Sequence, residues 1–480
     1  MDWGLLSNSL GSLSLSNNHL TAVTSGALSA LRALTQLELD GNRLHAVWPG
    51  ALPPSVAILR LSDNLLVHAS CALFASLPRL RHLHLRNNIL ADSPNYTCRS
   101  EQSRIELVDL SHNRLDDSYD LAFPTRRRLK QLILDFNEFT AIPLFVLTIS
   151  RIERLSISYN KLNHLSDTML SALKLNLEQL DLDHNELSSL PKLAPKTLTY
   201  LDLSYNQIVH ITVDSFGAWC SALTTLNLKG NRISQVAADS FSFAMPIREL
   251  FLSFNDLHHV EPVVFSNLTA LRVLEFSSGL LDGEFPASFT SEKLSWLSLD
   301  NNNIRYLSPV HLRNFPSLEY LNLDFNKLTE FPSGTKGVNG TSNLKELRVS
   351  LMHIDNHNFG GSLHLQIINL YNNNISVVKR RAFAELFALQ IVDLSNNRFL
   401  QLSVEQFHNM RHLRHLRLNI NELRSLPRDI FKNTVIEYLD LSDNHLITFP
   451  NNALSQIGFT LRKLELARNH LDELSYEAYN

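Results

Sequence analysis

The chain has 480 residues, of which 44% are hydrophobic and 19% are charged, and its formal net charge is −4. This balance excludes an intrinsically disordered chain and gives no electrostatic basis for binding nucleic acid or an anionic membrane. No apolar run approaches the roughly 20 residues that a helix needs to cross a bilayer.

The chain is built from one repeated pattern, which is clearest at residues 198–209, LTYLDLSYNQIV. Leu201 and Leu203 are two residues apart, so both point to the same face of a short strand. Asn206 comes where the chain turns away from that strand, and its side chain can bond backbone groups that the turn leaves unpaired. Ile208 then returns the chain to the core. One copy cannot bury its apolar face alone, so the pattern predicts stacked neighbours.

Twenty copies follow one another at a mean spacing of about 24 residues. Gly279 and Met352 replace the turn Asn in two of them. The pattern resembles the leucine-rich repeat and predicts an α/β solenoid, or horseshoe, with a parallel concave β-sheet and short helical or irregular convex segments. The turn asparagines are Asn18, Asn42, Asn64, Asn88, Asn113, Asn137, Asn160, Asn185, Asn206, Asn231, Asn255, Asn302, Asn326, Asn373, Asn397, Asn421, Asn444 and Asn469.

We interpret residues 1–480 as a single array of about 20 repeats. The N-terminal sequence MDWGLLSNSLGSLSLSNN lacks the basic start and the sustained apolar core of a signal peptide. It enters the first repeat at Leu13, and the last repeat stops shortly after Asn469. Because a repeat array needs polar caps, we expect the chain to be uncapped at both ends and to be a fragment of a longer array.

Two stretches depart from the pattern and are candidates for local bends. Residues 281–289, LDGEFPASF, follow the substitution at Gly279. Residues 333–343, SGTKGVNGTSN, have the composition of a loop insertion and precede Met352, whose thioether cannot donate a hydrogen bond as an amide does. The predicted bends therefore lie near residue 279 and within residues 333–352, and simple drift of the repeat is the alternative.

The odd number of cysteines leaves at least one of them unpaired within the chain. Cys71 and Cys98 fall on adjacent repeats but three residues out of register, so a disulfide between them requires a local shift. We expect Cys220 to be a small buried hydrophobic residue.

Four Asn-x-Ser/Thr sequons are candidate glycosylation sites, and none falls on a position that the repeat would bury. A chain this rich in Asn could also contain about four by chance. Their exposed positions favour a secreted protein. The sequons begin at Asn95, Asn267, Asn339 and Asn374.

No catalytic or cofactor-binding motif occurs in the sequence. It contains no Gly-x-Ser-x-Gly elbow, no phosphate-binding Gly-Lys-Ser/Thr loop and no His-Glu-x-x-His zinc motif. His408, His412 and His415 have helical spacing, but the repeat register places His415 in a strand and His408 on the convex side. We therefore expect no enzymatic activity, no cofactor and no metal site.

The concave face carries the candidate binding surface. Aromatic side chains precede the turn Asn in neighbouring repeats, and one more lies within a strand: Phe136, Tyr159, His184, Tyr205, Phe254 and Phe251. Adjacent strands are about 4.8 Å apart, so these rings are expected to form a stripe suited to contact with a protein. The alternative is that the rings only pack on one another. Carboxylates beside the stripe would set specificity at its rim: Asp135, Asp181, Asp183 and Asp202.

The motifs LDLSYN at 201–206, VDLSNN at 392–397 and LDLSDN at 439–444 resemble those of extracellular leucine-rich-repeat proteins, most of all the chaoptin-like adhesion glycoproteins. This resemblance implies a non-catalytic protein-binding module for cell adhesion and recognition. It would be secreted or lie on the extracellular face of the plasma membrane, held there by an anchor absent from this chain. Its partner would be a protein ligand or a like molecule on another cell, and not nucleic acid. A ligand-binding fragment of a Toll-like receptor ectodomain and a cytosolic leucine-rich-repeat scaffold are the alternatives.

Overall fold

The fold was analysed in a computed structural model in which the chain divides into two compact units. Unit 1 comprises Met1–Ile233 and Ser242–Pro246, and unit 2 comprises Ser234–Phe241 and Ile247–Asn480. The interpretation of the chain as one array therefore stays a prediction. The structure describes residues 8–68, 71–91, 104–119, 128–165, 176–190, 196–216, 218–241, 246–258, 260–265, 267–284, 289–307, 312–328, 343–351, 354, 359, 363–380, 382–383 and 385–474.

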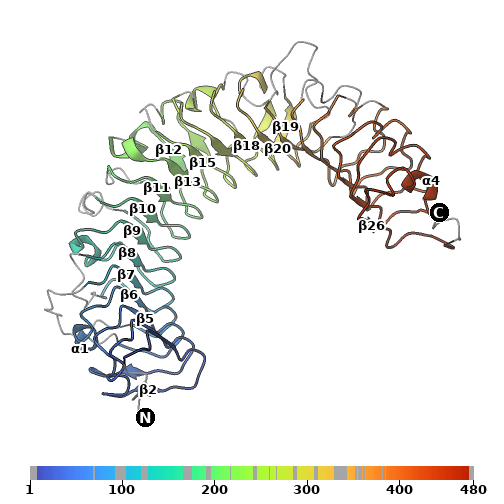
Figure 1. Cartoon of the computed structure of the whole chain (residues 1–480). Helices are drawn as coiled ribbons and strands as arrows, with labels where there is room; N and C mark the ends of the chain where they lie inside the picture. Colours follow the sequence, from blue (N-terminus) through green and yellow to red (C-terminus); the bar gives the residue numbers. More distant parts are fainter. Residues whose placement is uncertain are drawn as a thin grey trace. The chain divides into compact units, whose positions relative to one another are not determined.

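In unit 1, each repeat contributes one short strand to a parallel sheet, and the repeat leucines stay in register. Leu180, for example, is aligned with Leu155 on one side and with Leu201 on the other. These strands follow one another along the inner side of the coil, and irregular chain returns on the outer side (Figure 1). The paired strands are β1 (Ser12–Ser14), β3 (Gln36–Glu38), β5 (Ile58–Arg60), β6 (His82–His84), β7 (Leu107–Asp109), β8 (Gln131–Ile133), β9 (Arg154–Ser156), β10 (Gln179–Asp181), β11 (Tyr200–Asp202) and β13 (Thr225–Asn227).

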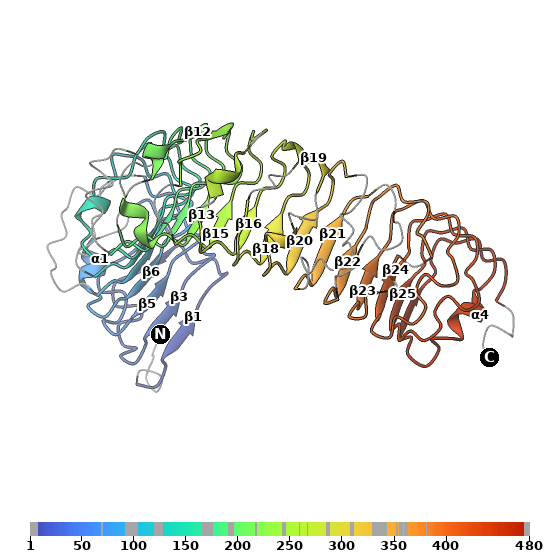
Figure 2. The same ribbon diagram turned by 90° about the horizontal axis from the view of Figure 1, so that it is seen from above.

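Unit 2 repeats the same arrangement, with parallel strands lying side by side (Figure 2). The apolar residue at the centre of each strand is again aligned with its counterpart in the next repeat, as Leu416 is with Leu439. The paired strands are β15 (Glu249–Phe251), β16 (Val273–Glu275), β18 (Trp296–Ser298), β20 (Tyr320–Leu323), β21 (Glu346–Val349), β22 (Ile367–Asn369), β23 (Ile391–Asp393), β24 (His415–Arg417), β25 (Tyr438–Asp440) and β26 (Lys463–Glu465).

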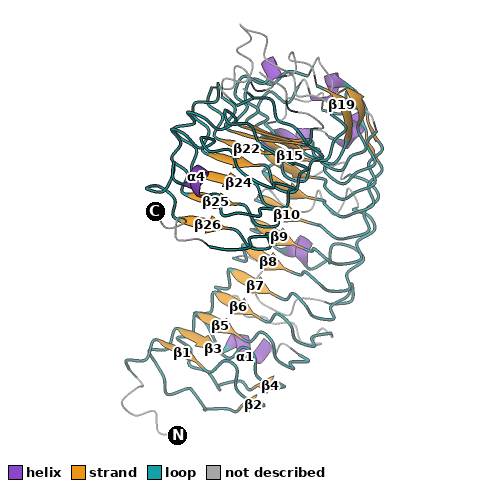
Figure 3. Ribbon diagram, turned by 90° about the vertical axis from the view of Figure 1, so that its right-hand side faces the viewer, coloured by secondary structure: helices purple, strands orange, loops and turns teal. Residues whose placement is uncertain are grey.

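The segments that return between the strands are mostly irregular chain with short helical turns, as the repeat pattern predicts (Figure 3). Among the described residues, no helix combines the length and the apolar character that a bilayer crossing requires. Within the described residues, the helices are α1 (Cys71–Ala75), η2 (Val146–Thr148), η3 (Val213–Ser215), η4 (Ala218–Ala222), η5 (Pro262–Phe265) and α4 (Asn451–Leu454), and the remaining short strands are β2 (Ala22–Val23), β4 (Ala46–Val47), β12 (His210–Ile211), β14 (Gln235–Val236), β17 (Asp282–Glu284) and β19 (Asn303–Tyr306).

In each unit, the core is a stack of strand leucines backed by aromatic side chains from the returning segments. Leu201 and Leu203 are fully buried, like most of their counterparts, whereas those of the first and last repeats are partly exposed. Phe383, Phe407 and Phe431 are buried behind the sheet of unit 2, with ring centroids 6.2 and 6.5 Å apart between successive repeats. Each repeat thus buries its apolar face only against its neighbours.

The turn asparagines, called ladder asparagines below, tie each repeat to the preceding one. The Asn206 amide donates to the carbonyl of Leu203 in its own repeat (3.1 Å) and to that of Leu182 in the preceding repeat (2.9 Å). Its Oδ1 accepts the backbone N–H of Leu187, also in the preceding repeat, at 3.0 Å. This confirms that the ladder side chain satisfies the backbone groups of the turn, and it shows that the same side chain bridges two turns.

Gly279, which has no side chain at the ladder position, is accommodated by the next repeat. Oδ1 of Asn302 accepts two backbone N–H groups there, from Gly279 at 3.0 Å and from Leu281 at 3.1 Å. A Cβ on Gly279 would lie 3.0 Å from the ring of Phe276, so that ring fills the vacant space. Met352 and residues 333–342 lie outside the described residues, and the predicted bends at both places stay predictions.

We predict that Asn206→Leu lowers the free energy of unfolding by about 1–3 kcal/mol, because buried backbone groups of two repeats lose their partner. Chemical denaturation of both proteins measures the difference. Asn18→Leu is the matched control. Asn18 is exposed and, among the residues that the structure describes, bonds only the carbonyls of Leu15 and Ser16, so its loss should be smaller. Equal stability of the Asn206→Leu variant and the wild type would refute the bridging role.

Candidate functional site

The residue before a ladder Asn adopts a left-handed backbone conformation in repeat after repeat. Its φ is 56° at Phe136, 53° at Tyr159, 52° at His184 and 53° at Tyr205. Residues other than Gly avoid this region, because it brings Cβ against the carbonyl oxygen at a cost of about 1–2 kcal/mol. The ladder bonds of the following Asn hold the turn in this conformation.

Five of these residues form one stack of rings, called the aromatic column below. Successive ring centroids lie 4.0, 4.1, 3.9 and 4.4 Å apart, and no two neighbouring planes differ by more than 20°. Each ring follows its strand by three residues, so the column runs along the carboxyl edge of the sheet rather than across its strands. The members are His112, Phe136, Tyr159, His184 and Tyr205.

His112 was not among the predicted stripe residues, although the sequence places it directly before the ladder residue Asn113. Its imidazole stacks on the ring of Phe136, and burial there lowers the pKa of His112, with Arg86 adding to the effect. The position before the ladder Asn was therefore the sequence signal for membership of the column. A histidine ring at that position stacks as well as the ring of a phenylalanine or a tyrosine.

Gly230 ends the column at Tyr205. Gly230 has a φ of +68°, and a Cβ built on it would lie 2.5 Å from Cδ1 of the Tyr205 ring. The terminal ring therefore lies directly over the backbone of the next repeat. Without a side chain at this position, the stack cannot continue.

The rings of the column are packed together and still open to solvent. Phe136 and Tyr159 are each 41% exposed and Tyr205 is 43% exposed. The Tyr159 hydroxyl is 3.1 Å from Nε2 of His184, whose Nδ1 is 2.8 Å from a carboxylate oxygen of Asp183, which fixes the central rings. The sequence left two interpretations open, a protein-binding stripe and rings that only pack on one another. This arrangement is compatible with both, because stacked rings leave their edges available to a partner. Protein binding by the column stays a prediction.

The two remaining aromatic residues of the predicted stripe belong to unit 2. Phe251 lies in β15 and is half-buried, and Phe254 follows in a left-handed turn and is 52% exposed. They are not members of the column of unit 1.

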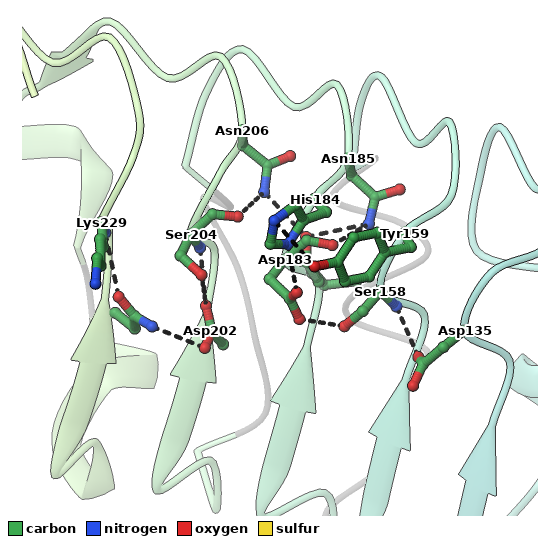
Figure 4. A network of polar contacts seen from close by, with 12 residues as sticks. Asp135, Ser158, Tyr159, Asp183, His184, Asn185, Asp202, Ser204, Asn206 and Lys229 are labelled. Atoms are coloured by element: carbon green, nitrogen blue, oxygen red, sulfur yellow. Dashed lines mark hydrogen bonds and ion pairs between the residues drawn. The ribbon is translucent and has the colours of Figure 1, made fainter. Parts of the chain in front are cut away.

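A row of carboxylates lies beside the column on the inner face (Figure 4). Oδ1 of Asp135 accepts the Ser156 hydroxyl at 2.6 Å and the backbone N–H of Ser158 at 2.8 Å. The Ser158 hydroxyl in turn donates to Asp183. These bonds orient the carboxylates but bring no positive charge to them.

Asp181 in β10 and Asp202 in β11 are directly aligned across the sheet. Burial, together with the charges of Asp202, Asp135 and Asp183, raises the pKa of Asp181 from 3.8 to about 7, although a hydrogen bond from Gln179 acts in the opposite direction. The Asp181 carboxyl group therefore changes between its protonated and ionised forms near neutral pH. No group of three or more His, Cys, Asp or Glu side chains suited to a metal ion occurs within the described part of the chain.

The other sequence predictions are tested only in part. Asn267 and Asn374 are exposed, as glycosylation requires, and Cys220 is buried as expected. Asn95, Asn339 and Cys98 lie outside the described residues, and so does the predicted disulfide.

We predict that Asp181→Asn makes the protein more stable at pH 8, by on the order of 1–3 kcal/mol. The folded state binds the proton of Asp181 more tightly than the unfolded state, so this group lowers stability as the pH rises from about 4 to 7. The gain should therefore fade between pH 7 and pH 4, which chemical denaturation across this range measures. Asp443→Asn should give no gain at pH 8, because the Arg468 side chain lowers the pKa of that carboxylate. A gain for Asp181→Asn that does not change with pH would contradict the prediction.

We predict that Gly230→Ala destabilises the protein more than Gly50→Ala does, by about 1 kcal/mol or more. Both glycines have a similar positive φ, but the nearest atom to a Cβ on Gly50 is 3.5 Å away, whereas on Gly230 it is a ring atom of Tyr205 at 2.5 Å. Thermal unfolding of the two variants gives the comparison. Equal losses would mean that the Tyr205 ring moves aside freely and that the column does not end in a tight contact.

A model of the leucine rich repeat matches segments that together cover more than half of the chain, at residues 127–187, 196–257, 221–281, 277–328, 342–399, 388–446 and 411–471. Podocan-like protein 1 from Mus musculus is 30% identical over 471 residues, which cover 84% of this chain and 77% of that protein. Podocan from Mus musculus is 26% identical over 468 residues, which cover 96% of this chain and 63% of that protein. The solved structure of a TLR13–ssRNA13 complex covers 95% of this chain and 88% of its own, with a TM-score of 0.56 at 19% identity, which shows the fold alone. The chain belongs to the leucine-rich repeat family.

Proposed function

We propose that this chain is a non-catalytic protein-binding module for recognition or adhesion, and that it binds its partner through the aromatic column of unit 1. The observation that carries the proposal is the exposure of the rings at the centre and at the Tyr205 end of a continuous five-ring stack. Aromatic side chains concentrate the binding energy of protein interfaces, and truncating one at a contact centre typically costs about 2 kcal/mol or more.

The column is also suited to binding because its rings are ordered before a partner arrives. Tyr159 is held between two rings whose centroids lie 4.1 and 3.9 Å away, and its hydroxyl lies within hydrogen-bonding distance of His184. A side chain that is already fixed loses little conformational entropy on binding, so more of its contact energy contributes to affinity.

We further propose that the protein acts outside the cell, either secreted or on the extracellular face of the plasma membrane. The exposed sequons at Asn267 and Asn374 support this location, because glycans of this kind are added in the secretory pathway. The chaoptin-like motifs support an adhesion role. The Toll-like alternative rests on shared repeat motifs and on likeness of the fold. The cytosolic alternative would leave both sequons unmodified.

We predict that the double variant Tyr159→Ala, Tyr205→Ala loses at least about tenfold in affinity for the native partner, because two contact rings are removed. A cell-aggregation assay, or a pull-down of the partner with the full-length protein, gives the readout, and circular dichroism confirms that the variant is folded.

The matched control is Leu144→Ala in the same unit. Leu144 is 72% exposed and lies in the returning segment, away from the strands. Loss of binding in the control together with full binding by the folded double variant would move the site to the outer side and would refute the proposed surface.

A further inference from the structure

We infer that the partner presents a basic segment of protein, whose Arg or Lys side chains lie against Asp181 and Asp202 while the segment contacts the aromatic column. This inference rests on the proposed function and specifies the chemistry of the partner. Four features of the inner face support it.

The first is a pair of like charges that the fold itself does not require. Asp181 and Asp202 are register partners in adjacent parallel strands. The same strand position holds Ser156 in the preceding repeat and Asn227 in the following one, so the repeat accepts neutral residues there. Directly opposed like charges destabilise a sheet. This pair, in which Asp181 is half-buried and Asp202 is buried, is therefore expected to serve a contact rather than the fold.

The second is that these carboxylates have no Lys or Arg partner in the described part of the chain. Asp202 accepts hydrogen bonds from Ser204, from the Tyr200 hydroxyl and from the Asn227 side chain, all of them neutral donors. Among the described residues, no Lys or Arg side chain forms an ion pair with Asp135, Asp181 or Asp202.

Unit 2 provides the contrast at the same position of the repeat. Asp393 follows the same motif and also bonds the Ser two residues later, but its Oδ2 is 3.1 Å from the guanidinium of Arg417 in the next strand. The repeat can therefore supply an internal cation to this position. In unit 1, the residue aligned with Asp202 in the next strand is the neutral Asn227, whereas the residue aligned with Asp393 is Arg417. A cation beside Asp202 would therefore come from a partner.

The third feature is that the charges and the rings come from the same two repeats. Asp181 and His184 belong to one repeat, and Asp202 and Tyr205 belong to the next. A guanidinium can bond a carboxylate through its N–H groups while its flat face or its stem packs on an aromatic ring. One Arg of a partner could therefore use both surfaces.

The fourth feature is energetic. The pKa of Asp181 is raised to about 7 by burial and by the neighbouring Asp202, Asp135 and Asp183 carboxylates. A cation placed beside the pair reverses the effect of the neighbouring charges and favours the ionised form. Contact with a basic partner therefore relieves a repulsion that the isolated protein retains.

The probe for this inference is a fluorescein-labelled peptide of twelve alternating Arg and Ser residues, with an alternating Glu and Ser peptide as its counterpart (about twelve residues span several repeats). Fluorescence anisotropy gives the Kd of each peptide for the full chain and its variants. The test variant is Asp181→Asn, Asp202→Asn. The matched control, Asp393→Asn, Asp440→Asn, removes the same two charges from the same strand position in unit 2.

We expect the test variant to raise the Kd of the Arg peptide about tenfold or more, the control to change it less than about twofold, and the Glu peptide not to bind. Equal losses in both variants would show attraction by net charge alone and would overturn the inference, as would undiminished binding by the test variant. Both pairs are isosteric, and thermal unfolding verifies that they fold. Failure of the proposed function is seen separately, as undiminished partner binding by the Tyr159→Ala, Tyr205→Ala protein.

Discussion

The buried side-chain amide of the ladder Asn is the interaction on which the rest of the structure depends. Asn206 donates to Leu203 in its own repeat and to Leu182 in the preceding one, and it accepts from Leu187. No repeat closes its own turn without its neighbour, because part of the hydrogen bonding crosses between them. The strand leucines supply the bulk of the apolar burial, and the ladder fixes where each turn lies relative to the next.

That constraint also produces the candidate binding surface. A turn closed in this way requires a left-handed residue just before the Asn, and the side chain of that residue emerges at the carboxyl edge of the sheet. Repetition of the turn places these side chains about one strand spacing apart, which lets flat rings stack. The aromatic column therefore arises where the repeat puts rings at a position whose geometry the ladder has already set. In unit 1, His184 connects this column to the acidic row through Asp183.

The sequence was sufficient to predict the solenoid, because the spacing of leucines and asparagines reports strand and turn directly. It also identified most of the column, since the position before Asn is fixed by the same spacing. It placed the stripe on the concave face, directly before the turn Asn, but it could not show that the rings stack along the carboxyl edge of the strands, because the left-handed turn is not visible in residue types. The alignment of Asp181 with Asp202 follows from the same spacing, because each lies four residues before its ladder Asn. The burial that raises the pKa of Asp181 does not follow from it. The tight contact of Gly230 with Tyr205 likewise depends on atomic positions.

Hydrogen exchange resolved to single backbone amides tests the central role of the ladder most directly. The N–H groups of Leu187 and Ile208 lie in turns. Their acceptors among the described residues are only the Oδ1 atoms of Asn206 and Asn231, respectively. If the ladder is as integral as the sheet, these amides should exchange as slowly as the strand-end amide of Leu203, which donates to a neighbouring repeat's backbone. Exchange at Leu187 and Ile208 close to the rate of an unprotected loop, with Leu203 still protected, would contradict this account.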